Sequence, residues 1–252
     1  MYELAKLTRH QSFQCAVKLR NLDKCAASME DLANQIVRFL YESLTDGGKP
    51  ACVLVRFFKT HSYGKLNEEL QNAAREILKG SPIDSETKCL TLLATAGDLP
   101  QWNDRQMSSA HKAIPLIDED FVSKAPMISQ LIKQFGLDIK SIIHPVPEIL
   151  AYNNDYKRIP SIFNVFYVPN ALTSPYIPAQ ENFVVPYGIK SVFGFGGMLP
   201  SGNVFAIILF TKIFIPIEIA YLFKWVAAYV RVAAASFDKV GCIFNDDVYL
   251  LN

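Results

Sequence analysis

The sequence carries almost no net charge, because 25 Lys and Arg oppose 24 Asp and Glu among its 252 residues. A nucleic-acid-binding protein gathers basic residues on one face or along one helix, and no segment of this chain does so. We therefore expect no nucleic-acid partner. Charged residues make up only 19% of the chain and hydrophobic residues 50%, which is typical of a packed globular protein and not of a disordered one.

Long uninterrupted apolar runs are scarce as well. The amino-terminal stretch MYELAKLTRHQSFQ has no apolar core of the kind a signal peptide needs, which favours a cytoplasmic location. The most apolar region, 204–237, is broken by charged residues and a proline, and it contains no charge-free run of the roughly 20 residues that span a bilayer. We expect a buried strand followed by an amphipathic helix there, and no membrane span.

Cysteine is present without pattern. The five cysteines lie far apart and form no CxxC pair: Cys15, Cys25, Cys52, Cys89 and Cys242. Unpatterned cysteines in a cytoplasmic protein are usually reduced, buried thiols, so the sequence predicts neither a metal site nor a redox site.

Hydrophobic periodicity predicts an α+β fold. Ser28 with Asp31 three residues later is typical of a helix start, and ACVLVRFF at 51–58 is apolar enough for a central strand. We predict helices at 28–44, 67–79, 127–135 and 217–237, and strands at 51–58, 89–96, 163–168, 191–199 and 204–210. Late strands joined by tight turns predict an antiparallel sheet with helices packed on it.

Glycines cluster in SVFGFGGMLPSGN, residues 191–203. A dinucleotide-binding loop needs a third glycine where Leu199 stands and a helix after it, and a phosphate-binding loop needs a Gly-Lys-Ser/Thr ending. Both are missing, and residues 200–203 suit the turn of a hairpin instead. One strand face carries Gly194 and Gly196, which leaves room for a helix, a backbone or a ligand to come close.

The run NVFYVPNALTSPYIPAQENFVVPYGIKSVFGFGGMLPSGNVFAIILFTKIFIP, residues 164–216, resembles the second half of GAF-like input domains of bacterial sensor histidine kinases. LTLLATAGDLPQWNDR, residues 90–105, resembles part of the first half. The resemblance spans about 28–237 and implies one GAF-like (or PAS-like) domain over 1–252 with short flanking segments. It further implies a five- or six-stranded antiparallel sheet, a small-molecule pocket on one side, and homodimerisation through the terminal helices. It names no ligand and no cofactor.

The function expected from this resemblance is signal sensing without catalysis. Such a domain binds a small ligand or a partner, including a downstream signalling protein, and transmits the change through its terminal helices. The catalytic cysteine cluster of a free methionine sulfoxide reductase, the N-K-x-F-D-E pattern of cyclic-nucleotide sites and the setting of a bilin cysteine are all unmatched. Two alternatives stay open: a haem- or other cofactor-binding protein or enzyme on the same scaffold, and a pure interaction domain whose pocket is filled by its own aromatics.

Candidate pocket residues are aromatic, cationic or imidazole side chains near strand ends and in the proline-rich loop. Trp102 and its neighbour Arg105 suit a pocket rim, although one buried indole anchoring a loop explains the tryptophan equally well. His144 suits a haem iron or an anionic ligand, or a simple loop position. The tyrosines either line a cavity or fasten the loop. The full set is Trp102, Arg105, His111, His144, Tyr167, Tyr176, Phe183 and Tyr187.

Overall fold

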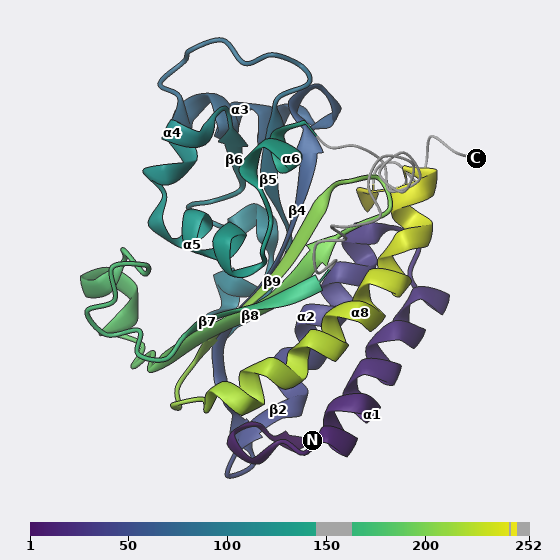
Figure 1. Ribbon diagram of the computed structural model, residues 1–252, viewed down its shortest axis with the longest axis vertical. Helices are drawn as coiled ribbons and strands as arrows, with labels where there is room; N and C mark the ends of the chain where they lie inside the picture. The colour runs from purple at the N-terminus through teal and green to yellow at the C-terminus, as the bar shows by residue number, and fades with distance from the viewer. Residues whose placement is uncertain (145–162, 242, 246–252) are drawn as a thin grey trace.

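A six-stranded sheet forms the centre of the computed structural model, which describes residues 1–144, 163–241 and 243–245 (Figure 1). Every neighbouring pair in the order β6-β5-β4-β9-β8-β7 is antiparallel. The predicted α+β class with an antiparallel sheet is therefore confirmed. The strands are β4 (Cys52–Ser62), β5 (Lys88–Gly97), β6 (Ala113–Leu116), β7 (Phe163–Val168), β8 (Ser191–Met198) and β9 (Val204–Thr211).

Helices cover both faces of this sheet, each over its own apolar core. The face that packs against α2 and α8 is called the first face, and the opposite one the second face. On the first face lie α1 (Arg9–Arg20), α2 (Met29–Ser43), α3 (Glu68–Ile77) and α8 (Ile217–Val240). On the second face lie α4 (Glu119–Ser123), α5 (Pro126–Gln134) and α6 (Ile139–Ile143). Figure 1 shows α1, α2 and α8 running together along one side of the strands.

Short elements connect these layers. A small three-stranded sheet joins the amino terminus to the end of α2 and consists of β1 (Tyr2–Glu3), β2 (Leu44–Asp46) and β3 (Lys49–Pro50). Single turns of helix are η1 (Leu4–Lys6), η2 (Asn21–Lys24), η3 (Tyr63–Lys65), η4 (Pro100–Asn103) and η5 (Arg105–Met107), together with a π-helical turn, η6 (Gln180–Val184). The connection η4–η5 leads from β5 toward β6, and η6 lies between β7 and β8, so both bring side chains to the ends of central strands.

Local signals place most of these elements where the sequence predicts them. The Ser28 hydroxyl accepts a hydrogen bond from the Asp31 amide at the start of α2, as the capping pattern indicates. Several elements escape prediction, among them α1, β6, the short helices α4 and α6 and the small sheet β1–β3. α1 exposes much of its surface but is capped by Thr8 and packs on α8, and β6 contains Pro115, which only an edge strand tolerates.

The glycine-rich hairpin is the one that the sequence predicts, with Gly202 at a φ of 83° in its turn. The room beside Gly196 is taken by close packing: a side chain there would lie 2.9 Å from the ring of Phe135, the residue that caps the end of α5, and would overlap the backbone of β9. No helix in the described part of the chain is both long and apolar enough to cross a membrane.

Candidate functional site

Arg56 is the one charged side chain of the apolar run 51–58, and it lies on the second face of the central strand β4. Its strand partners are Thr95 of β5 and Ile208 of β9, and side chains at paired positions share a face of the sheet. The Arg56 Nη2 donates a hydrogen bond of 3.1 Å to the Ser108 hydroxyl. Arg56 takes part in none of the ion pairs formed by the described residues.

Two polar atoms at this point of the sheet lack hydrogen-bond partners. Both the Arg56 Nε and the Thr95 hydroxyl are buried and unpaired among the residues that the structure describes. An unpaired buried polar group costs on the order of 1–3 kcal/mol, and more when it is charged. Burial also lowers the pKa of Arg56 to about 10. The fold thus holds a half-buried guanidinium, and within the described ranges the Ser108 hydroxyl is the acceptor it reaches.

His111 lies beside this guanidinium. The His111 side chain is exposed as a whole, but partial desolvation of its imidazole, followed by the positive charge of Arg56, lowers the pKa of His111. Its backbone is left-handed, with a φ of 64°, a conformation that few residues other than glycine adopt. The Ser108 hydroxyl donates in turn to the Ala110 carbonyl at 2.8 Å. Residues 108–111 therefore form a turn over Arg56, and His111 is the one predicted pocket residue that this turn contributes.

Three other predicted pocket residues meet on the second face, but they pack against one another. The ring centroids of Trp102 and Tyr187 are 4.7 Å apart and those of Trp102 and Phe183 are 5.7 Å apart. Phe183 also contacts Phe210 at 5.0 Å, whose strand partner on β4 is Leu54. This aromatic cluster lies two strand residues, about 7 Å, from Arg56. It forms an apolar wall beside the guanidinium and anchors η4 and η6 to the sheet.

The remaining histidine and tyrosines lie elsewhere. Tyr167 and Tyr176 both line a shallow depression of about 310 Å³ formed by residues 167–176, and the Tyr167 hydroxyl donates to the Ile215 carbonyl at 2.6 Å. His144 is exposed at the end of α6. No group of three or more His, Cys, Asp or Glu residues is placed to hold a metal ion within the described ranges.

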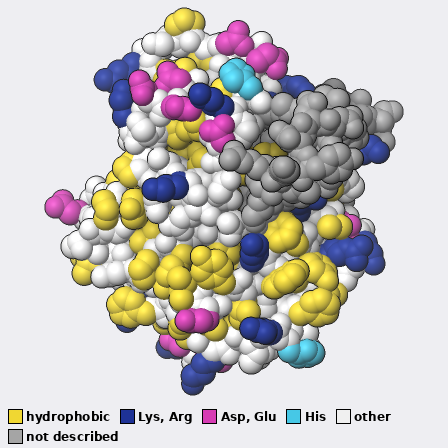
Figure 2. All heavy atoms as spheres, in the orientation of Figure 1, with side chains coloured by type: hydrophobic (Ala, Val, Ile, Leu, Met, Phe, Trp, Pro, Cys, Tyr) yellow, Lys and Arg dark blue, Asp and Glu magenta, His cyan; other side chains and the backbone are white. Residues whose placement is uncertain are grey.

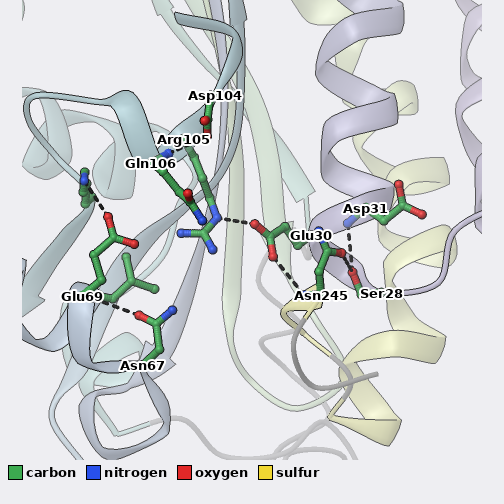
Figure 3. A network of polar contacts seen from close by, with 11 residues as sticks. Ser28, Glu30, Asp31, Asn67, Glu69, Asp104, Arg105, Gln106 and Asn245 are labelled. Atoms are coloured by element: carbon green, nitrogen blue, oxygen red, sulfur yellow. Dashed lines mark hydrogen bonds and ion pairs between the residues drawn. The ribbon is translucent and has the colours of Figure 1, made fainter. Parts of the chain in front are cut away.

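The prediction that Arg105 accompanies Trp102 at a pocket rim needs correction. Arg105 is buried and forms an ion pair with Glu30 of α2, and its guanidinium lies 5.6 Å from the centroid of the Phe244 ring. Figure 3 shows Arg105 pointing to Glu30, whose other oxygen accepts a hydrogen bond from the Asn245 amide at 2.9 Å. Arg105 therefore ties η5 to α2 and to the segment after α8, because a buried guanidinium needs a carboxylate.

The first face of β4 carries a second buried charge. The Lys59 Nζ lies 3.2 Å from Asp238 Oδ1 of α8, and both side chains are only 2% exposed. Burial lowers the pKa of Lys59 to about 8, against the opposing effect of Asp238. The other Asp238 oxygen accepts a hydrogen bond from the Ser201 amide at 3.2 Å. Asp238 thus joins β4, the β8–β9 hairpin and the end of α8.

Sequence reasoning overlooks both Arg56 and Lys59. Signals for both exist, because each is a charged residue within the predicted central strand or directly after it, and a charge in a buried strand requires either a partner or a function. What the sequence does not contain is the identity of the partner. Asp238 follows Lys59 by 179 positions, whereas Arg56 receives no carboxylate in the described part of the chain.

Comparison with known proteins finds likenesses among solved structures but no match by sequence. No family model matches, and no curated protein matches by sequence. Among solved structures, one likeness is the X-ray structure of free methionine-R-sulfoxide reductase from Neisseria meningitidis in complex with its substrate. It covers 92% of this chain and 93% of that chain at 9% identity and a TM-score of 0.47.

That protein is an enzyme, which contradicts the sequence-based prediction that this chain is not one. The prediction rested on unmatched motifs, and absent motifs do not exclude catalysis at so low an identity. At this identity and TM-score, the likeness says nothing about the reaction, the substrate or the site of this chain.

Proposed function

We propose that the protein is a signal-input domain, which binds a small molecule on the second face beside Arg56 and passes the change through β4 to α8. One observation carries the proposal: a single central strand bears charged side chains on both faces, the half-buried Arg56 with its buried, unpaired Nε and the fully buried Lys59. Arg56 lies on the second face, where its guanidinium donates a hydrogen bond to the Ser108 hydroxyl. Lys59 lies on the first face, in a buried ion pair with Asp238 of α8.

The coupling follows from the geometry of a strand. Arg56 and Lys59 are three residues, about 10 Å, apart along β4, so a ligand that displaces the strand at one position displaces it at the other. A buried ion pair resists such displacement, because it loses attraction with distance while its desolvation cost remains. Asp238 would then transfer the shift to the carboxyl-terminal turns of α8 and to the β8–β9 hairpin. A ligand shifts this equilibrium by its difference in affinity for the two arrangements.

The coupling can be tested without knowing the ligand. Arg56→Met changes only the second face, and we expect it to change the hydrogen-exchange rates of amides 233–240 in α8 several-fold, measured by mass spectrometry. Arg20→Met removes the same charge from an exposed position on α1 and should leave these amides unchanged. In a Lys59→Met/Asp238→Leu background, Arg56→Met should no longer affect them. Identical exchange in Arg56→Met and wild type would refute the proposed transmission.

The partner that we propose for α8 is a second copy of the chain. Its outer surface carries a stripe of exposed apolar residues at helical spacing, namely Ile217, Tyr221, Trp225 and Val232, each 46–64% exposed. Figure 2 shows hydrophobic side chains gathered over the part of the molecule where Figure 1 draws α8. A contiguous exposed apolar stripe is typical of a protein-interaction surface, and a stripe on one straight helix can meet its own copy about a two-fold axis.

We expect the wild-type protein to have the mass of a dimer in light scattering, and Trp225→Asp to have the mass of a monomer. A carboxylate at the centre of the stripe would be buried without a partner, which the dimer cannot tolerate. The control is Val185→Asp. Val185 is an apolar residue of similar exposure (59%) directly after η6, and this variant should remain a dimer. A monomeric wild-type protein would refute the proposed dimer but would not bear on the proposed ligand site beside Arg56.

A further inference from the structure

We propose that Arg56 is the receptor for a carboxylate, and that the ligand of the second face is a small monocarboxylic acid with an apolar body. This inference rests on the proposed ligand site and adds the chemistry of what occupies it. It does not depend on how the signal leaves the domain.

The donors around Arg56 suit a planar, monovalent acceptor. The guanidinium presents its N–H groups in a rigid fork that matches the two oxygens of a carboxylate. In this fork the Nε has no partner among the described residues, and the Nη2 donates to the Ser108 hydroxyl. The Thr95 hydroxyl, on the same face at the paired strand position, is also without a partner in the described chain. A carboxylate that replaces Ser108 as acceptor would satisfy the fork and lie within reach of Thr95.

Charge selects the monoanion over the dianion. Among the described residues, no hydrogen bond or ion pair brings a second cation to Arg56, and Lys112, which follows His111 in the chain, is paired with Glu69 at 2.6 Å. Partial desolvation and the positive charge of Arg56 lower the pKa of His111, which disfavours a second positive charge beside the guanidinium. A phosphate group carries close to two negative charges and is usually held by several cations or by a helix amino terminus. A single guanidinium is balanced by a single carboxylate.

The surroundings of the guanidinium select an apolar body. Leu54 and Phe58 flank Arg56 on the same face of β4 and belong to the second-face core. The aromatic wall begins two residues along β4 from Arg56, where Phe210 pairs with Leu54. The turn 108–111 covers Arg56 from the other side, and three of its four residues are exposed. A ligand that enters beneath this turn therefore meets one charged group among apolar side chains.

The experiment measures the binding of simple carboxylates to the purified full chain by isothermal titration and by ligand-observed NMR. The probes are benzoate and phenylacetate, with benzamide and phenylacetamide as neutral counterparts of the same shape and inorganic phosphate as a dianion. We expect the carboxylates to bind at least about tenfold tighter than the amides, because only the carboxylates form the charge-assisted fork. Phosphate should bind more weakly than either carboxylate.

Variants assign this binding to Arg56. Arg56→Met should abolish the preference for carboxylate over amide, and Arg56→Lys, which keeps the charge but loses the fork, should weaken carboxylate binding about tenfold. Ser108→Ala removes the competing hydroxyl and should bind the carboxylates as tightly as wild type or more tightly. Arg20→Met, with the same loss of charge at a distant surface, should bind like wild type. Circular dichroism confirms that each variant is folded before it is compared.

Three results would overturn the inference: equal binding of carboxylate and amide, unchanged carboxylate preference in Arg56→Met, or no carboxylate binding up to about 10 mM, the range expected of fragments this small. Hydrogen exchange of α8 with benzoate bound separates this inference from the proposed function. Carboxylate binding that leaves α8 unchanged would support the receptor and refute the transmission. If benzamide binds as tightly as benzoate and changes the exchange of α8, the proposed coupling to α8 is supported and the carboxylate specificity of Arg56 is refuted.

Discussion

Asp238→Ala should lower the free energy of unfolding by about 3–5 kcal/mol, the range measured when one member of a buried ion pair is removed. The variant leaves the Lys59 ammonium in a site where each side chain of the pair is 2% exposed. It also removes the acceptor of the Ser201 amide in the β8–β9 hairpin. Urea denaturation followed by circular dichroism at neutral pH measures the loss.

Two further variants separate the unpaired charge from the lost contact. Lys59→Met/Asp238→Leu replaces the pair with apolar side chains and should recover most of the stability, because neither charge then remains buried. Glu119→Ala breaks the exposed Lys140–Glu119 contact, whose side chains are 76% and 55% exposed, and should cost less than about 1 kcal/mol. A double variant as unstable as Asp238→Ala would show that the apolar replacements pack poorly and that the charge was not the cause.

The elements that could be predicted from the sequence are those marked by a pattern of a few neighbouring residues. The strand at 163–168 and the helix beginning after Ser28 match the structure closely, because an apolar strand pattern and a capping serine act over a few residues. α1 is not among the predicted elements, although Thr8 and Gln11 form a capping box at its start. The rest of its sequence carries little apolar periodicity, and its packing on α8, about 200 residues later in the chain, is a tertiary contact that no local pattern records.

The candidate site could be predicted only in part, for the same physical reason. Trp102, Phe183 and Tyr187 are conspicuous in the sequence, and they do meet, because packing against one another removes much of their apolar surface from water. Arg105 is as conspicuous, yet it pairs with Glu30 on the opposite face of the sheet. Which carboxylate a given arginine reaches depends on strand order and helix placement, and these are properties of the whole fold.

Gly196→Ala should cost about 4 kcal/mol or more, an exceptional loss for the addition of one methyl group. The new Cβ would overlap the carbonyl oxygen of Phe205 and lie 2.9 Å from both the Ala206 Cα and the Phe135 ring. The Phe135 ring could turn aside, but the β9 backbone could not, because β8 and β9 are hydrogen-bonded at this position in the middle of the sheet. The strands would have to separate locally, and adjacent ladder hydrogen bonds would weaken.

Gly48→Ala is the matched control for this variant. Gly48 has a φ of 80° and nothing within 4 Å of an added Cβ, so the same substitution there costs only the conformational strain of about 1–2 kcal/mol. Gly196→Ala combined with Phe135→Leu should remain as unstable as Gly196→Ala alone, since the overlap with the backbone persists. Rescue by Phe135→Leu would instead mean that Gly196 serves only to admit α5 against the sheet. The strand spacing between β8 and β9 would then tolerate a side chain at this position, and the second face would be more adaptable to a ligand than this close packing implies.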